Sequence, residues 1–241
     1  MTGGGRGIGR AVSRRLGAEG AQVVVHYGHD ADAAEATASA VREAGGRAET
    51  VGALLGRTDP EKEAVDLWNR VDAVVSGVDI LVNNAGAADV RGTIDTIEPA
   101  DLHRLWAVNA AAPFFITKHA LRRIVDGGRI VNVSTHLTRG AAQPDLITYT
   151  MTKAAVDAFT AALAKQLGGR GITVNAVAPG VVDTDMNAAW LGQARDMVAG
   201  LSPLGRVADA TDIADIIAFL ASDDSRWITG QHIDASGGAL L

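Results

Sequence analysis

The chain has 241 residues, is 47% hydrophobic and carries a formal net charge of −6 at pH 7, as expected for one domain with a large core. The absence of cysteine excludes disulfides, thiolate nucleophiles and zinc–thiolate sites, and the acidic balance with scattered Lys and Arg argues against nucleic-acid binding. No apolar run approaches the roughly 20 residues that span a bilayer and no secretory signal is seen, so we expect a cytoplasmic protein without a membrane partner.

Apolar runs of strand length alternate with longer helical stretches along the chain. We expect buried strands, rich in Val and Ile, at residues 21–27, 48–54, 80–83, 129–134 and 172–178. Helices are expected at residues 8–19, 32–44, 61–75, 100–124, 149–168 and 211–221. This alternation predicts βαβ units, and therefore a single doubly wound α/β domain over residues 1–241, with helices on both faces of a parallel sheet.

A glycine-rich turn, Thr-Gly-Gly-Gly-Arg-Gly-Ile-Gly, occupies residues 2–9 at the start of the first expected helix. Glycine permits a positive φ and lets backbone N–H groups approach a pyrophosphate at the N-terminus of a helix, where the helix dipole favours an anion. The turn therefore predicts a dinucleotide-binding site formed by Gly3, Arg6, Gly7, Ile8 and Gly9.

The strand that normally precedes such a turn is missing, because the turn begins at residue 2. That strand lies in the middle of a doubly wound sheet, and its loss leaves two neighbours with unpaired, buried backbone groups. We favour a start site assigned too far downstream; the alternatives are a protein that has lost the strand, and a tag or neighbouring chain that replaces it. Adding an upstream apolar strand of about seven residues is expected to raise the melting temperature and to tighten ligand binding at the turn.

Three further motifs follow the glycine turn in order. Asn-Asn-Ala-Gly at residues 83–86 closes one strand, Tyr149 and Lys153 stand four residues apart on one helix face, and Asn-Ala-Val-Ala-Pro-Gly at residues 175–180 closes another strand. Together they resemble the classical short-chain dehydrogenase/reductase family over the whole chain except the absent strand. The resemblance implies an oxidoreductase that uses a nicotinamide cofactor to interconvert a carbonyl and an alcohol, commonly as a homotetramer.

The resemblance also implies a set of cofactor-binding residues. They are Asn83, Ala85 and Gly86 at the adenosine ribose, Tyr149 and Lys153 at the nicotinamide ribose, and Pro179, Gly180 and Thr184 around the nicotinamide. Leu54 stands where the family has an aspartate that bonds the adenine.

The identity of the cofactor depends on the end of the strand at residues 21–27. An NAD enzyme places an acidic residue there to hold the ribose 2′-hydroxyl, but this chain has Tyr27. No carboxylate would repel a 2′-phosphate, and Arg6 is available to pair with it. We therefore expect NADP(H), with NAD as the alternative.

The catalytic residues implied by the resemblance are Asn109, Thr135, Tyr149 and Lys153. Tyr149 would exchange a proton with the substrate oxygen. The Lys153 ammonium and the positive nicotinamide of the oxidised cofactor are expected to move the phenol's pKa from about 10 toward neutrality. Thr135 would polarise the same oxygen, and Ser134 is the alternative. Adjacent strand side chains point to opposite faces, so only one of the two hydroxyls can take this role. Pro113 has no N–H, so the carbonyl of Asn109 would be free to bind a water that relays protons to Lys153.

Residues 183–204 are expected to form a substrate lid. Trp190, Leu191 and Met197 are candidate lining residues, and His136 should face the pocket. The favoured function is an NADP(H)-dependent ketoreductase or alcohol dehydrogenase acting on a small molecule, without a metal. The alternatives are an NAD-linked polyol or sugar dehydrogenase and a catalytically silent dinucleotide-binding or regulatory protein.

Overall fold

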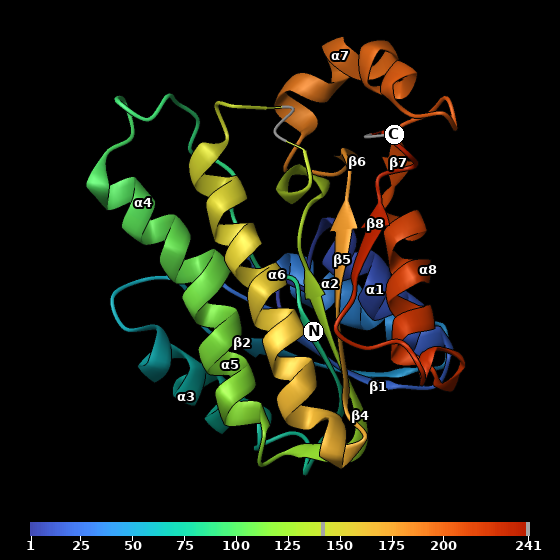
Figure 1. Cartoon of the computed structure of the whole chain (residues 1–241). Helices are drawn as coiled ribbons and strands as arrows, with labels where there is room; N and C mark the ends of the chain where they lie inside the picture. The colour runs from blue at the N-terminus through green and yellow to red at the C-terminus, as the bar shows by residue number, and fades with distance from the viewer. Residues whose placement is uncertain (141–142, 240–241) are drawn as a thin grey trace.

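The computed structural model describes residues 1–140 and 143–239 and has a parallel sheet between two layers of helices (Figure 1). Strands β1 (Gln22–Tyr27) and β2 (Arg47–Gly52) form one parallel pair. The other four main strands run parallel in the order β3 (Val78–Asn83), β4 (Ile124–Val133), β5 (Thr173–Pro179) and β8 (His232–Ala235). The short strands β6 (Val182–Asp183) and β7 (Ala208–Asp209) pair separately.

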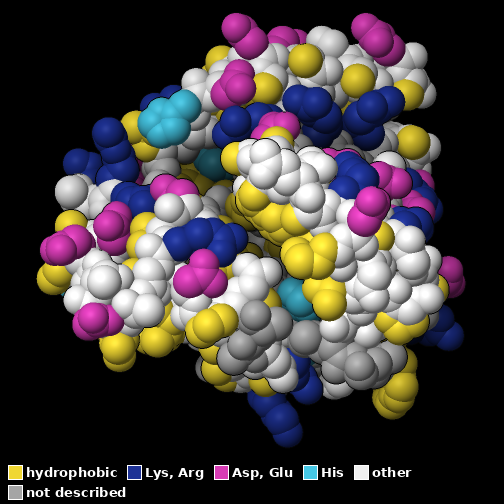
Figure 2. All heavy atoms as spheres, turned by 90° about the horizontal axis from the view of Figure 1, so that it is seen from above, with side chains coloured by type: hydrophobic (Ala, Val, Ile, Leu, Met, Phe, Trp, Pro, Cys, Tyr) yellow, Lys and Arg dark blue, Asp and Glu magenta, His cyan; other side chains and the backbone are white. Residues whose placement is uncertain are grey.

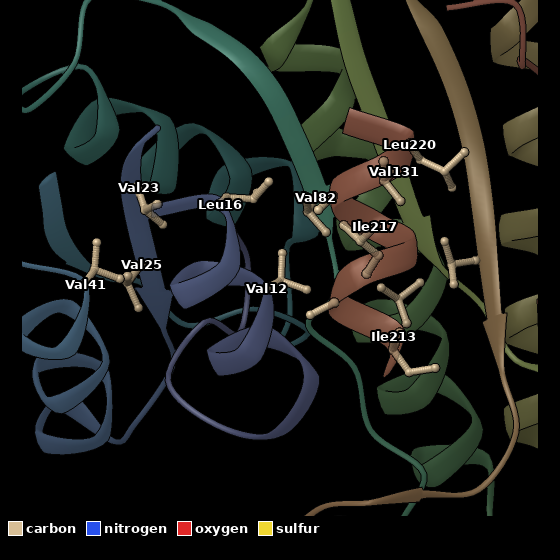
Figure 3. Close-up of a cluster of buried hydrophobic side chains, with 14 of the residues drawn as sticks. Val12, Leu16, Val23, Val25, Val41, Val82, Val131, Ile213, Ile217 and Leu220 are labelled. Carbon is tan, nitrogen blue, oxygen red and sulfur yellow. The ribbon is translucent and has the colours of Figure 1, made fainter. Parts of the chain in front are cut away.

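One face of the sheet packs against α1 (Gly7–Ala18), α2 (Ala31–Glu43) and α8 (Ala210–Ala221). Figure 3 shows the valine, isoleucine and leucine side chains of this core, which come from these helices and from β1, β3 and β4. The β-branched side chains on the strands suit a sheet that is buried on both faces. The described fold is therefore the α/β architecture that the alternating apolar runs predict.

The opposite face packs against α3 (Pro60–Val71), α5 (Ala112–Ala120) and α6 (Ile147–Leu167). Two further helices lie toward the carboxyl ends of the strands: α4 (Pro99–Trp106), which runs on toward α5, and α7 (Ala188–Leu201) (Figure 1). No helix among the described residues is both long and apolar enough to cross a membrane.

The expected helix at residues 100–124 is wrong in two respects. It consists of α4, a π-helical turn η1 (Ala107–Ala111) and α5, which ends at Ala120. Strand β4 then begins at Ile124, well before the expected residue 129, and its pairing with β3 is irregular at Val78 and Ile80. The segment Leu-Arg-Arg-Ile-Val at residues 121–125 fits the end of a helix or the start of a strand equally well, which is why the pattern placed this boundary too late. Helix α7 and strand β8 were not expected as separate elements.

The sheet is open between β1 and β3. A cavity of about 740 Å³ lies there, lined by residues of both strands and by Leu67 and Trp68 of α3. Only the first two residues enter this position: the N–H of His26 donates to the carbonyl of Met1 at 3.0 Å, and the N–H of Thr2 donates to Val82 at 3.1 Å. The two sheets are thus joined at their carboxyl ends, where the glycine turn begins.

His26, at the end of β1, connects the glycine turn to β2. Its side chain is 4% exposed. Nδ1 accepts a hydrogen bond from the N–H of Gly3 at 3.1 Å, and Nε2 lies 2.8 Å from the carbonyl oxygen of Ala53. A neutral ring with its hydrogen on Nε2 satisfies both contacts, and burial lowers the pKa of His26 to about 4.

Stability is therefore expected to fall as the pH drops from about 6.5 to about 4. In this window the unfolded chain binds a proton at His26 and the folded chain does not, so protonation favours unfolding. At pH 5 the loss due to His26 should reach about 2 kcal/mol. Urea unfolding of the wild type and of His26→Gln at pH 7 and pH 5 checks this, because the variant lacks the titrating ring. Equal losses of stability in the two proteins would contradict the role of His26.

Candidate active site

The glycine turn and the carboxyl ends of the strands enclose a cleft of about 580 Å³. The cleft lies at the N-terminus of α1, where unpaired N–H groups and the helix dipole favour an anion. Gly7 has a φ of 49°, and a side chain on Gly9 would overlap the carbonyl oxygen of Gly3. This turn therefore requires glycine, and its shape fits a pyrophosphate.

Most of the predicted cofactor residues line this cleft: Gly3, Arg6, Gly7, Ile8, Tyr27, Ala85, Gly86 and Thr184. Leu54 also lines it, as expected from its position after β2. The carboxylate of Asp30, close to the end of β1, caps α2 by accepting a hydrogen bond from Ala33 at 2.9 Å. Tyr27 thus occupies the end of β1 with the exposed Arg6 on the same cleft. These residues fit a dinucleotide, and they suit a phosphate better than a ribose hydroxyl that needs a carboxylate.

Asn83 does not line the cleft. Its side chain points into the core, where Nδ2 donates to Asn132 Oδ1 at 2.8 Å and to Thr117 Oγ1 at 3.0 Å. The neighbouring Asn84 lines the cleft instead, and its Nδ2 donates to the carbonyls of Thr2 and Gly3 at 3.0 and 3.2 Å. Because adjacent strand side chains face opposite sides, only one of these two asparagines can reach the turn. Asn84 is the residue that fixes the turn's position.

Gly9, Tyr149, Lys153, Pro179 and Gly180 also lie outside the residues that line the cleft. Gly9 acts through close packing inside the turn. Pro179 ends β5 and pairs with Ala235 of β8, and a side chain on Gly180 would come within 3.1 Å of Ser236. These residues shape the chain between the cleft and α7.

Thr135, Tyr149 and Lys153 come together where β4 ends and α6 begins. The Thr135 hydroxyl lies close enough to the Tyr149 phenol to lower its pKa. The ammonium nitrogen Nζ of Lys153 is 5.9 Å from the centre of the Tyr149 ring and donates to the carbonyl of Val133 at 2.7 Å. The Ser134 hydroxyl is buried and has no hydrogen-bond partner among the described residues. Of the two adjacent hydroxyls, Thr135 is therefore the one beside the phenol.

The pKa of Tyr149 does not move toward neutrality as expected. Burial raises it to about 12, and the nearby Thr135 hydroxyl only partly opposes this. Burial also lowers the pKa of Lys153 to about 8, against the attraction of the Asp157 carboxylate. The cost of burying a charge outweighs the attraction between phenolate and ammonium at this separation. Tyr149 is therefore a protonated phenol at neutral pH, ready to donate.

Asn109 lies in the π-helical turn η1 and is completely buried. Its Nδ2 donates to the carbonyl of Ala87 at 2.8 Å and to Thr152 Oγ1 at 3.1 Å, while its Oδ1 accepts from the N–H of Ala87 at 2.8 Å. A side chain on Gly86 would come within 3.4 Å of Lys153 Nζ. Asn109 thus fixes the chain after β3 against α6, next to the lysine; a proton relay through its carbonyl stays a prediction.

A second cavity, of about 860 Å³, lies below α7. His136, which directly follows Thr135, lines it together with Val181, Trp190 and Met197. Leu191 does not line it, because that side chain is buried against Val198 and Val207. Figure 2 looks onto the end of the molecule that α7 covers and shows hydrophobic side chains and a histidine in a hollow there. Thr135, Tyr149 and Lys153 line neither cavity themselves, but His136 of this cavity follows Thr135 and Gly86 of the cleft lies next to Lys153.

Comparisons with known proteins agree with this geometry. A family model described as enoyl-(acyl carrier protein) reductase matches residues 3–239. Versicolorin reductase 1 of Aspergillus parasiticus is 36% identical over 255 aligned residues, which cover 100% of this chain and 95% of that protein.

Two solved structures cover the whole chain. The promiscuous reductase LugOII, which catalyses keto-reduction at C1 during lugdunomycin biosynthesis, is 42% identical with a TM-score of 0.94, and 96% of that chain is covered. The angucycline C-6 ketoreductase LanV with bound NADP is 46% identical with a TM-score of 0.94, and 94% of that chain is covered.

Proposed function

This chain belongs to the short-chain dehydrogenase/reductase family, and we propose that it is an NADP(H)-dependent ketoreductase that uses Tyr149 as its proton donor. One observation carries the proposal: Thr135, Tyr149 and the buried Lys153 lie together, with Gly86 of the dinucleotide-sized cleft beside Lys153 and His136 of the apolar cavity directly after Thr135. The completeness of this group argues against a catalytically silent protein.

The proposed cofactor site is the cleft at the glycine turn. Backbone N–H groups at the start of α1 would hold the pyrophosphate, and Arg6 would pair with the 2′-phosphate beside Tyr27. Lys153 would hold the nicotinamide ribose, and Thr184, which lines the same cleft, would bond the carboxamide. When bound, the nicotinamide supplies the hydride. LanV, which is 46% identical to this chain, was crystallised with bound NADP, and this supports NADP(H) over NAD as the cofactor here.

The proposed proton path begins at Tyr149. A substrate carbonyl oxygen that accepts hydrogen bonds from Thr135 and Tyr149 becomes more electrophilic at its carbon, because both hydroxyls stabilise the charge that develops on oxygen. Tyr149 then transfers its proton to this oxygen. The Lys153 ammonium stabilises the phenolate that remains, and a water on the carbonyl of Asn109 would return a proton through Lys153.

The pH dependence of reduction is expected to follow Lys153. With pKa values of about 12 for Tyr149 and about 8 for Lys153, both groups are protonated at pH 6–7, and only the lysine loses its proton near pH 8. The rate of reduction should therefore be constant up to pH 7 and fall as the pH rises through 8. Initial rates between pH 6 and pH 10 at saturating NADPH test this. A rate that stays constant to pH 10 would mean that the lysine charge is not required.

We also propose that residues 183–204, which contain α7, act as a substrate lid, and that the protein forms a homo-oligomer, either a tetramer or a dimer. The outer faces of α4, α5 and α6 expose Trp106, Phe114 and Met151, whose side chains are 43%, 48% and 45% exposed. Figure 1 shows these helices side by side on one flank. Large apolar side chains gathered in this way favour an interface between copies.

Phe114→Lys is expected to shift sedimentation toward smaller species, because the lysine places a charge in the apolar interface. If the wild type and Phe114→Lys both sediment as monomers, the interface is refuted.

The function is tested most simply with ring ketones. The purified chain is incubated with 1-tetralone, whose ketone is fused to an aromatic ring, and in parallel with a polyol, using NADP(H) and NAD(H) separately. We expect oxidation of NADPH with the ketone, with a clear preference over NADH. Activity confined to the polyol with NAD would support the alternative of an NAD-linked dehydrogenase, and no activity in any combination would support a silent protein.

A further inference from the structure

The cavity below α7 has mainly apolar walls. They include Val181 after β5, Trp190, Met197 and Leu201 of α7, and Ile216 of α8. At about 860 Å³, it has room for a ligand of several fused rings. Such walls match flat apolar rings and offer little to a sugar or polyol, whose hydroxyls would lose hydrogen bonds to water on entering.

The charged side chains around this cavity already have partners. Arg91 pairs with Asp145 at 2.6 Å, and Arg206 pairs with Asp212 at 2.6 Å. The carboxylate of Asp234 accepts a hydrogen bond from the N–H of Ser236 at 2.8 Å. Consequently these groups do not need a ligand to be satisfied.

His136 is different. Its side chain is only 7% exposed, it lines the cavity, and its Nδ1 is buried without a hydrogen-bond partner. No side-chain hydrogen bond to another described residue is found at Nε2 either, and because this nitrogen is not fully buried it is the one left to face the cavity. A polar ring held in this way is unusual, because buried polar groups are nearly always paired.

The ring nitrogens have different roles in the neutral imidazole. Burial lowers the pKa of His136, against the attraction of the Asp234 carboxylate, so the ring is neutral at pH 7 and carries one hydrogen. A buried N–H without a partner is costlier than a buried bare acceptor. The hydrogen therefore belongs on Nε2, which makes His136 a donor directed into the cavity.

We propose that His136 donates a hydrogen bond from Nε2 to a second oxygen of the substrate, and that the substrate is a fused-ring aromatic ketone that carries this oxygen away from the reacting carbonyl. The proposal rests on the ketoreductase function above. Thr135 precedes His136 in an extended conformation, with φ −156° and ψ 149°, so the two side chains diverge. Thr135 reaches Tyr149, while His136 reaches the apolar cavity. A flat substrate that spans both would be fixed at two oxygens, which determines which of its carbonyls is reduced.

The test compares 1-tetralone with the four hydroxytetralones that carry a hydroxyl on the aromatic ring. The wild type is expected to prefer at least one hydroxytetralone by about tenfold or more in kcat/KM, mainly through KM, because a site built to bond a hydroxyl disfavours the analogue that lacks it. His136→Leu should abolish this preference, so that its kcat/KM for the preferred hydroxytetralone falls to the value that the same variant has for 1-tetralone. His136→Gln, which keeps a donor, should restore part of it. His103→Leu, the same change at an exposed histidine on α4, is the matched control.

The outcomes separate this proposal from the function on which it rests. If the wild type reduces 1-tetralone and all four hydroxytetralones with equal efficiency, His136 does not read a second oxygen, although the ketoreductase function stands. If His136→Leu loses the same factor on every substrate together with a lower melting temperature, its role is structural and the proposal fails. If the wild type reduces none of them with either cofactor but binds a hydroxytetralone, and His136→Leu does not, the ketoreductase function fails while the hydrogen bond stands. If the wild type neither reduces nor binds any of these ketones, both the ketoreductase function and the hydrogen bond from His136 are overturned.

Discussion

Tyr149→Phe is expected to lower the turnover number for ketone reduction by roughly a thousandfold, the range typical for loss of a positioned general acid. The variant removes only the phenolic hydroxyl, which is the proposed proton donor and the partner of Thr135. The cofactor cleft is lined by other residues, so the dissociation constant of NADPH should change only a few-fold. Initial rates give the turnover number, and a fluorescence titration gives NADPH binding.

The control compares two variants that each remove one of the adjacent hydroxyls after β4. Thr135→Val should also lose most turnover, because it removes the hydroxyl beside Tyr149. Ser134→Ala removes a hydroxyl that is buried away from the phenol and without a partner among the described residues, so its turnover should stay close to that of the wild type. Substantial turnover by Tyr149→Phe would show that the proton comes from elsewhere. Equal losses of turnover in Thr135→Val and Ser134→Ala would show the same.

The second large effect concerns the cofactor. Tyr27→Asp is expected to reverse a preference for NADPH into one for NADH. The carboxylate would stand at the end of β1, where it repels a 2′-phosphate and accepts a hydrogen bond from a ribose hydroxyl. A repulsion of about 2 kcal/mol corresponds to a change of roughly thirtyfold in relative affinity. Dissociation constants of NADPH and NADH for both proteins measure this directly.

Two further variants separate charge from shape at this position. Tyr27→Phe keeps the ring that packs over Gly52 and adds no charge, so its preference should remain with NADPH. Arg6→Gln removes the nearest cation of the cleft and should weaken NADPH while leaving NADH almost unchanged. Tighter binding of NADH than of NADPH by the unmodified protein would refute the assignment at Tyr27.

The fold and the cofactor turn follow from patterns that act locally. Alternating apolar runs predicted the parallel sheet, and glycines at residues 3, 7 and 9 predicted the turn, because a positive φ and close packing leave little choice of residue. The open position between β1 and β3 was also predictable, since the glycine turn begins at residue 2 of the printed sequence.

The details that the sequence did not predict depend on contacts between distant segments. Asn83 and Asn84 are the same residue type in adjacent positions. Which of the two side chains reaches the turn depends on how β3 is oriented in the sheet, and in the structure it is Asn84. His26 looked like an ordinary strand residue, because its partners Gly3 and Ala53 are brought to it by the fold. The effect of burial on the pKa of Tyr149 was missed for the same reason: it depends on what packs around the phenol, and the spacing of Tyr149 and Lys153 does not contain it.

The central claim is that this chain delivers a hydride to a ketone carbon while Tyr149 protonates the oxygen. The most direct test is to reduce 1-tetralone with NADPH that carries deuterium at C4 of the nicotinamide, on each face in turn, and to analyse the alcohol by mass spectrometry. We expect one deuterium on the carbinol carbon from one of the two labelled cofactors and none from the other. Alcohol formed without deuterium from either cofactor, or no alcohol at all, would contradict it.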